Sequence, residues 1–275
     1  MTKNSGLTLE IYKRIDALLE QPQSPGNLNM LLRLLAKWRS AVVQNTLIKR
    51  DGIRVISGVF EGMEFIEKSS EGCHVPKLIG CYEQPLQPYI EAAIKKAHPV
   101  VINIGCAEGY YAVGLARRMP NAKIYAYDID ANGRETCANL AEKNGVSDQV
   151  VIGELFTPAD FSEFENQNAL VICDIEGAEK AMLDPVAAPA LKTMDIIVEC
   201  HEEFVPGITN LLKERFKQSH DIAHITDIGH RQIENPKWLE TLGHMDQLIA
   251  SWEWRGGPTP WLALTQKKPN RQGKN

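Results

Sequence analysis

The 275-residue sequence lacks several features that would restrict its class. Its six cysteines are scattered and none forms a C-x-x-C pair, so we expect reduced thiols, most of them packed in the core. No apolar run approaches the roughly 18 residues of a membrane span, and no signal-peptide core follows Met1. We therefore expect a cytoplasmic protein.

The sequence also lacks the excess positive charge that attracts phosphate backbones. Its formal net charge is −5 at pH 7, which disfavours nucleic acid as a partner. Internal repeats and low-complexity tracts are missing as well. What is present is a hydrophobic fraction of 44%, enough to form the core of one large α/β domain with an appendage.

The first 80 residues predict an N-terminal cap. Segment 21–26 contains two prolines and a glycine, and it separates two stretches in which leucine and isoleucine recur at helical spacing. Residues 53–66 alternate loosely around Gly58 and Gly62, which indicates a short β-hairpin. We expect residues 1–80 to form a helical and β-hairpin cap.

From residue 81 onward, helical patterns alternate with short apolar runs, as in a parallel sheet that is buried on both faces. Strands are predicted at 100–104, 123–127, 149–152, 169–173, 195–200, 222–226 and 261–265. Helices are predicted at 110–118, 131–143, 178–183 and 207–217, with a further helical segment at 238–249. The predicted fold over 81–268 is a Rossmann-like, seven-stranded, mostly parallel sheet flanked by helices, followed by a polar tail at 269–275.

The strongest chemical signal is the strand, turn and helix start written VVINIGCAEGYY, residues 100–111. Gly105 and Gly109 allow a ligand to approach the turn, which lies at the carboxyl edge of the sheet. About twenty residues later the second strand ends at Asp128, where a carboxylate accepts the hydroxyl hydrogens of a ribose. These features predict a ligand that contains a nucleoside. Asp130 directly precedes a helix, and we expect it to be the N-cap.

A nicotinamide dinucleotide is disfavoured, because the pattern G-x-G-x-x-G fails at two positions. Ala107 replaces the second glycine and crowds a pyrophosphate. Tyr110 replaces the third glycine and is too bulky for the close packing of helix on strand that this glycine permits.

The same run resembles motif I of class I S-adenosylmethionine-dependent methyltransferases, and the resemblance assigns 81–268 to such a domain. It implies S-adenosylmethionine as the cofactor. The motif matches at Gly105, Glu108, Gly109 and Asp128. Further candidate cofactor contacts are Asn103, which stands where the family often has an acid, Tyr110, and Glu154 after the third strand. Glu83, beside Tyr82, is another candidate and directly precedes the helix that leads into the first strand.

A second run, DIEGAE at 174–179 followed by VECHE at 198–202, resembles the FkbM-type methyltransferases. In that family the fourth strand ends in D-x-E-G-A-E and the fifth in an acid followed closely by histidine. The resemblance covers about residues 80–204. It implies O-methylation of a hydroxyl on a sugar, glycan or other small molecule, without identifying the acceptor.

The catalytic candidates are Asp174, Glu199 and His201. His201 is the candidate base, because the unperturbed pKa of histidine is near neutrality, and Asp174 would orient it, bind the acceptor or face the sulfonium. The alternatives are a helix cap for Asp174 and a simple charge partner for His201. Glu179 is expected to face solvent or form an ion pair. A divalent metal on Asp174 and Glu199 stays open, although the sequence shows no metal-specific spacing.

Other functions remain as alternatives. They are a nucleic-acid or protein methyltransferase, a nicotinamide-dependent oxidoreductase and a non-catalytic binding module. Methylation of an amino group on adenine or glutamine is disfavoured, because no N-P-P-Y-type run follows the fourth strand. Trp252, Trp254 and Trp261 would stack on a sugar or planar acceptor, or close the edge of the sheet. The oligomeric state is left open.

Overall fold

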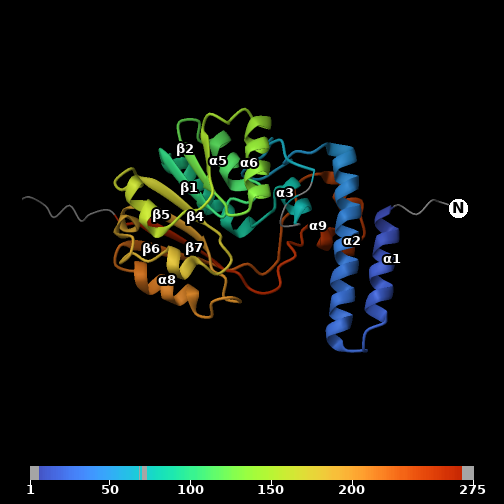
Figure 1. Ribbon diagram of the computed structural model, residues 1–275. Coiled ribbons are helices and arrows are strands. Elements are labelled where there is room, and N and C mark those ends of the chain that lie inside the picture. The colour runs from blue at the N-terminus through green and yellow to red at the C-terminus, as the bar shows by residue number, and fades with distance from the viewer. Residues whose placement is uncertain (1–5, 68, 70–72, 268–275) are drawn as a thin grey trace, which may run out of the picture.

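The computed structural model describes residues 6–67, 69 and 73–267, so the polar tail predicted at 269–275 lies outside the described residues. Its centre is a seven-stranded sheet of order β3-β2-β1-β4-β5-β7-β6 (Figure 1). β1 to β5 pair in parallel, and β7 runs antiparallel between β5 and β6. The prediction of a Rossmann-like, mostly parallel sheet is confirmed. The strands are β1 Val100–Ile104, β2 Lys123–Tyr127, β3 Val150–Gly153, β4 Ala169–Cys173, β5 Asp195–Glu199, β6 His220–Ile225 and β7 Trp261–Gln266.

The sheet is buried on both faces, which explains why its central strands are almost wholly apolar. Val101 and Ile172 belong to a core on one face, while Ile102 and Val171 belong to a core on the other. Figure 1 shows α5 and α6 on one side of the sheet and α8 on the other. The helices of the main domain are α4 Gln87–Lys96, α5 Tyr110–Arg118, α6 Ala131–Lys143, α7 Glu179–Met182 and α8 Ile208–Phe216, with 3-10 turns at Pro158–Phe164 and Pro189–Thr193.

Most predicted helices have the expected bounds, and α5 and α6 match to the residue. Asp130 is the N-cap of α6, as predicted, because its carboxylate accepts from the backbone N–H groups of Asn132 and Gly133. The helix predicted at 238–249 is wrong as one element. Leu242 and Gly243 are extended, and they divide it into a 3-10 turn at Lys237–Thr241 and α9 at His244–Ala250.

Two long helices form the N-terminus, α1 (Gly6–Leu19) and α2 (Pro25–Asp51), and the predicted break lies between them. Ser24 caps α2 by accepting from the backbone N–H of Asn27. Residues 53–66 turn back on themselves, but within them the structure has a single antiparallel bridge, Arg54 to Glu64, in place of two regular strands. Gly58 in this turn packs against the chain at Gly80, since a Cβ at Gly58 would lie 2.2 Å from the Gly80 carbonyl oxygen. The short α3 (His74–Leu78) and a 3-10 turn at Gln84–Leu86 lead into α4.

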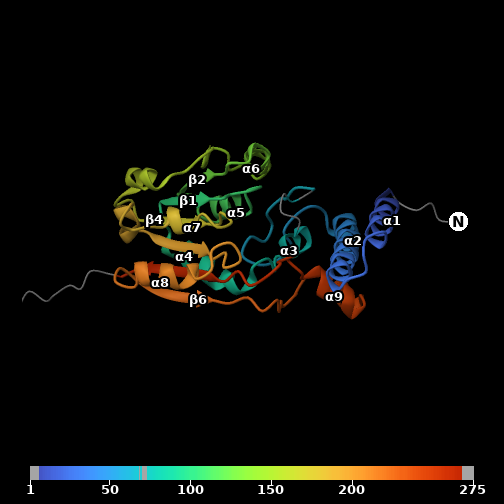
Figure 2. The ribbon, with the colours of Figure 1, turned by 60° about the horizontal axis from the view of Figure 1, so that its bottom comes forward.

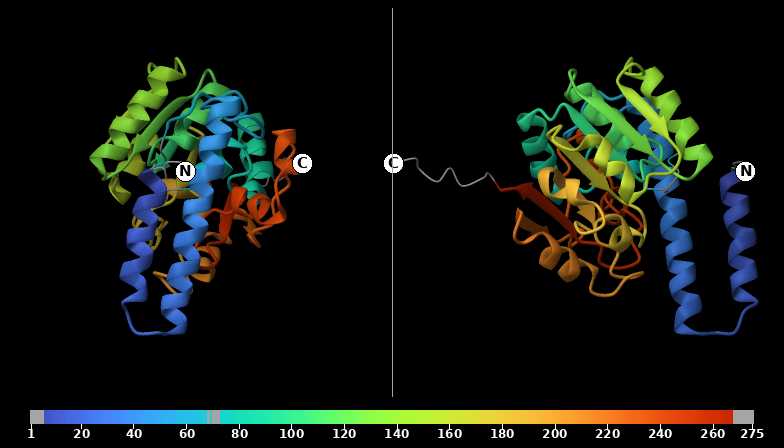
Figure 3. Two further views of the ribbon diagram at one scale, coloured as in Figure 1. Left: turned by 90° about the vertical axis from the view of Figure 1, so that its right-hand side faces the viewer. Right: turned by 60° about the vertical axis from the view of Figure 1, so that its left-hand side comes forward.

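The N-terminal helices lie beyond the carboxyl ends of the parallel strands. Figures 1 and 2 both place α3, α9 and α2 there, with α1 on the outer side of α2. Figure 3 shows the loop between α1 and α2 projecting away from the sheet. Arg39 of α2 bonds Asp246 of α9 at 2.6 Å, and Leu47 of α2 shares a core with Val101 of β1. In the described part of the chain, no helix combines the length and apolarity that crossing a bilayer requires.

Two leucines of α2 test whether this helix is part of the core. Leu47 is 1% exposed and Leu32 is 66% exposed. We predict that Leu47→Ala lowers the free energy of unfolding by about 2–5 kcal/mol, because it leaves a cavity. The matched change Leu32→Ala should alter it by less than about 0.5 kcal/mol. Urea unfolding measures both, and equal effects would contradict the packing described.

Candidate functional site

Four residues form a row across the carboxyl edge of the sheet. Ile104 of β1 pairs with Tyr127 of β2 and with Cys173 of β4, and Cys173 pairs with Val198 of β5. The residue that follows each of these positions therefore lies just beyond the last parallel rung, although Glu199 still pairs with Trp261 of β7. In spatial order these residues are Asp128, Gly105, Asp174 and Glu199. The register thus brings these four residues, which the sequence analysis singled out separately, to one edge of the sheet.

A cavity of about 640 Å³ lies at this edge and is bordered by Gly105, Asp128 and Asp174. Ligands of open α/β sheets bind in this crevice. Its charged lining is entirely acidic. The carboxylates that border it belong to Asp128, Asp130, Glu154, Asp174 and Glu176, and no lysine, arginine or histidine lines it among the described residues.

The turn after β1 requires glycine for steric reasons. Gly105 has φ of 77°, and a Cβ there would lie 1.7 Å from the carbonyl oxygen of Asp174. Gly109 has φ of 92°, and its Cβ would lie 2.6 Å from the Sγ of Cys137 on α6. Both glycines therefore allow close approach of neighbouring chain segments and the left-handed backbone.

Asp128 ties the ends of β1 and β2 together. Its Oδ2 accepts from the backbone N–H of Ala107 at 2.7 Å, and its Oδ1 accepts from the N–H of Asp130 at 2.8 Å. Each carboxylate oxygen keeps a further lone pair for a ligand hydroxyl. Because the N–H of Ala107 already donates to a carboxylate, the turn is poorly suited to bind a phosphate.

Glu108 and Asn103 lie beside a second, much smaller cavity. The buried carboxylate of Glu108 accepts from the Lys77 ammonium at 2.5 Å and from Ser69, so its charge is compensated inside the protein. The Oδ1 of Asn103 is buried and has no hydrogen-bond partner among the described residues. The cavity between them has about 20 Å³, room for one water-sized group. An unsatisfied acceptor at this position fits a donor group of a ligand.

His201 lies among the three acidic side chains of Glu179, Asp174 and Glu199. Its Nδ1 lies 2.7 Å from Glu179 Oε1, while its Nε2 lies 3.5 Å from Asp174 and 3.7 Å from Glu199. Glu179 is fully buried, so the expectation that it faces solvent is wrong and the expectation of an ion pair is right. Glu179, the first residue of α7, therefore orients His201 through Nδ1.

The acidic neighbours change the protonation of His201. Burial alone would lower the pKa of this histidine, but the hydrogen bond to Glu179 and the charge of Glu199 raise the pKa above its usual value. The same hydrogen bond holds the pKa of Glu179 below its usual value against the opposing effect of burial. The pair is thus an imidazole held next to a carboxylate anion, an arrangement that stabilises an imidazolium.

Arg255 joins Glu199 to Glu83. Its guanidinium donates to Glu199, to Thr259 and, at 2.6 Å, to Glu83. Burial raises the pKa of Glu83 to about 8, although the charge of Arg255 opposes the shift. Glu83 also accepts from the Tyr111 hydroxyl. Glu83 therefore positions Arg255 and, through it, Glu199.

The remaining predicted residues lie in different surroundings. The Glu154 side chain is 76% exposed at the rim of the large cavity, 4.0 Å from Arg134. Tyr110 is buried among the aromatic rings of Phe60, Phe65 and Tyr82 and borders only the small cavity. Asp174 does not cap α7, whose N-cap is Ala178 and has no side-chain bond.

The tryptophans before the last strand do not close the edge of the sheet. Trp261 lies within β7, an interior strand, and is buried. Trp252 and Trp254 lie against α2, where Arg33 lies 5.5 Å from the centre of one ring and Lys37 4.4 Å from that of the other. The expected edge position is wrong because β7 inserts between β5 and β6.

Sequence reasoning missed Arg255, Lys77 and the role of Glu179. Arg255 is 56 residues from Glu199, and Lys77 is 31 residues from Glu108. Neither lies in a recognisable motif, and each pair forms only when distant segments fold together. The useful signal was the acid-rich run at 174–179, which predicted carboxylates at the site but not which of them would contact His201.

Ligand atoms of Asp174, Glu199 and His201 all lie within 4.8 Å of one another. Such a donor set of oxygen and nitrogen suits a divalent cation. Glu199 is already paired with Arg255, and Asp174 lies 3.5 Å from the imidazole of His201. A cation would therefore compete with these existing contacts.

The sequence matches no protein-family model and no curated protein. Among solved structures, the chain is similar to a proposed O-methyltransferase from Klebsiella pneumoniae (14% identity, TM-score 0.48, 82% of this chain and 97% of that chain). It is also similar to an O-methyltransferase from Bacillus cereus in complex with SAH, with 10% identity and a TM-score of 0.44 over 97% of this chain and 93% of that chain. A third similar structure is the O-methyltransferase of tomaymycin synthesis from Streptomyces achromogenes, in complex with SAM. It has 12% sequence identity and a TM-score of 0.44, over 66% of this chain and 80% of that chain. At these TM-scores, the fold assignment rests on the strand order.

The pair of His201 and Glu179 gives a prediction for titration. Replacing Glu179 by glutamine removes the anion that stabilises the imidazolium, so the pKa of His201 should fall. NMR titration of the His201 ring protons measures this pKa. Glu203→Gln, in the same loop, is the control and should leave the pKa of His201 unchanged. A pKa that is unchanged in Glu179→Gln would contradict the assigned partner.

Proposed function

We propose that the chain is an S-adenosylmethionine-dependent methyltransferase that methylates a hydroxyl of a sugar, glycan or other small molecule. The observation that carries the proposal is the wholly acidic charge of the 640 Å³ cavity at the carboxyl edge. A sulfonium cofactor is cationic and gains from such a lining, whereas a pyrophosphate is repelled by it. This also argues against a nicotinamide dinucleotide and against a nucleic-acid acceptor.

The residues at the edge suit the parts of the cofactor. Asp128 would bind the ribose hydroxyls, and Glu154 would meet the adenine amino group above the apolar side chains of Ile129 and Phe156. The turn through Gly105 brings its backbone to the same cavity. The unsatisfied Oδ1 of Asn103 would accept from the amino group of the methionine portion. We assign Glu108, Gly109, Tyr110 and Glu83 to supporting positions around these contacts.

When bound, S-adenosylmethionine supplies an electrophilic methyl group. The chain must then place the acceptor hydroxyl and hold its proton. With Nδ1–H donating to Glu179, His201 presents Nε2 toward Asp174, which borders the cavity. His201 would accept the proton at Nε2, Glu179 would stabilise the imidazolium, and Asp174 would hold the hydroxyl. These roles, together with the DIEGAE run, support an FkbM-type assignment.

A divalent cation on Asp174, Glu199 and His201 is a second way to acidify the hydroxyl. The existing pairing of Glu199 with Arg255, and of His201 with Glu179, favours proton transfer to His201 instead. We further propose that residues 1–80 cover the acceptor side, since α2 and α3 lie beyond the carboxyl edge (Figure 2).

Calorimetry with S-adenosylhomocysteine tests the cofactor assignment. We predict that Asp128→Ala weakens binding by about 1–3 kcal/mol, through loss of charge-assisted hydrogen bonds to the ribose. Asp148→Ala removes an exposed carboxylate just before β3, at the opposite edge of the sheet, and should leave the affinity unchanged. Equal affinities of all three proteins would refute the role of Asp128.

Methyl transfer tests the base. With an acceptor found by screening hydroxyl compounds, His201→Gln should slow turnover by about 10²–10⁴-fold while S-adenosylhomocysteine binds as before. A base works unprotonated, so the raised pKa of His201 predicts that activity increases with pH through that pKa. In Glu179→Gln the rise should occur at lower pH. Unchanged turnover in His201→Gln eliminates this base, and loss of activity on adding a chelator favours the cation.

A further inference from the structure

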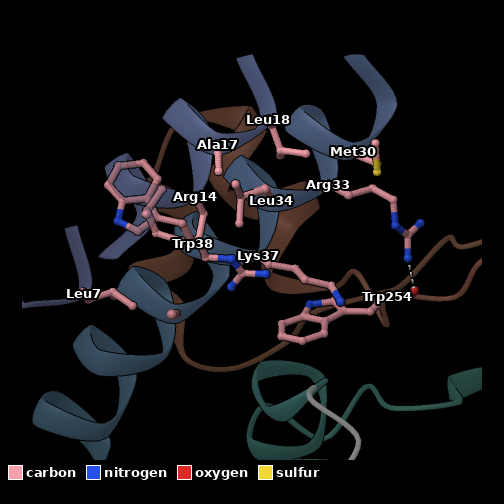
Figure 4. A pocket seen from close by; sticks show the side chains of 12 residues that line it. Leu7, Arg14, Ala17, Leu18, Met30, Arg33, Leu34, Lys37, Trp38 and Trp254 are labelled. Carbon is pink, nitrogen blue, oxygen red and sulfur yellow. Dashed lines mark hydrogen bonds between the residues drawn. The ribbon is translucent and has the colours of Figure 1, made fainter. Parts of the chain in front are cut away.

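A third cavity, of about 720 Å³, lies between α1 and α2. Trp254 from the segment before β7 closes one side of it, as Figure 4 shows. We call it the hairpin groove. Much of its surface is apolar, including Ile11 and Leu18 of α1 and Leu34 of α2.

All charged side chains that line the hairpin groove are basic. They are Arg14 of α1 and Arg33 and Lys37 of α2. In Figure 4, Lys37 reaches over the ring of Trp254, with Arg14 on one side and Arg33 on the other. Within residues 6–67, 69 and 73–267, no carboxylate forms an ion pair with any of the three. Burial, and then the charges of Arg33 and Arg14, lower the pKa of Lys37.

Further donors in the groove also lack acceptors. The indole N–H groups of Trp38 and Trp254 are buried and have no hydrogen-bond partner in the described part of the chain. Lys37 stands 4.4 Å from the centre of the Trp254 ring, and Arg33 donates to the Trp254 carbonyl at 2.7 Å. The three basic side chains therefore make the hairpin groove a local positive site in a protein of net charge −5, and this site would attract an anion.

We propose that the hairpin groove binds a single-chain amphiphile, an apolar chain that ends in a carboxylate or phosphate. The anionic group lies between Arg14, Lys37 and Trp254, and the chain packs along Ile11, Leu18 and Leu34. The charge and the apolar surface of the groove occur together, which fits one ligand with both properties. A free inorganic anion would leave the apolar lining exposed, and a neutral lipid would leave the cations uncompensated.

The groove is also connected to the site at the sheet edge. Trp254 lies between Glu253 and Arg255, and the Arg255 side chain bonds Glu199 and Glu83. The groove and the site at the sheet edge therefore share one short stretch of chain, residues 253–255.

Fluorescence titration tests the proposal, since Trp38 and Trp254 line the groove. Dodecyl phosphate and dodecanoate, each below its micelle concentration, should bind and change the tryptophan emission. Dodecyltrimethylammonium has the same chain and the opposite charge and should not bind. Inorganic phosphate should bind at least about tenfold more weakly than dodecyl phosphate, because it buries no apolar chain.

Arg14→Gln and Lys37→Gln should each weaken binding of dodecyl phosphate by about tenfold, the equivalent of one charge-assisted contact. Lys13→Gln is the matched control, because it removes an exposed cation next to Arg14 and should leave the affinity unchanged. Circular dichroism checks that the variants fold. Equal binding of the cationic and anionic amphiphiles, an affinity insensitive to Arg14 and Lys37, or binding only to vesicles of anionic phospholipid would each overturn the proposal.

Discussion

The close approach of Gly105 to the carbonyl of Asp174 is the constraint on which the rest of the site depends. A side chain at Gly105 would overlap that carbonyl, so only glycine allows β1 and β4 to end side by side. The parallel register of β2, β1, β4 and β5 then brings Asp128, Asp174 and Glu199 into one row. Asp128 then closes the turn by accepting from the N–H of Ala107.

The two cavities differ in the charges that line them. Among the described residues, only carboxylates contribute charge to the lining of the cavity at the sheet edge, which would favour a sulfonium. The neighbouring Glu199 does not line this cavity and is paired with Arg255. The charged side chains that line the hairpin groove between α1 and α2 are all basic. The net charge of −5 conceals this division. Local pairing, more than total charge, therefore decides which ligand each cavity attracts.

The sequence was sufficient to predict the sheet, because strands buried on both faces appear as apolar runs and the glycine turn specifies the first crossover. It also predicted Asp128, Asp174, Glu199 and His201, since each stands directly at or just past a strand end. It did not predict that Glu179 holds His201 or that Lys77 neutralises Glu108. The residues of each pair are distant in the chain, with Glu179 22 residues from His201 and Lys77 31 residues from Glu108. Local sequence patterns carry no signal for such contacts.

A crystal structure of the protein with S-adenosylhomocysteine would test the cofactor assignment by direct observation. We predict the ribose hydroxyls within hydrogen-bond distance of the Asp128 carboxylate, the adenine against Ile129 and Phe156, and the sulfur facing Asp174. A ligand bound elsewhere, or a nicotinamide dinucleotide occupying this cavity in place of S-adenosylhomocysteine under the same conditions, would contradict it.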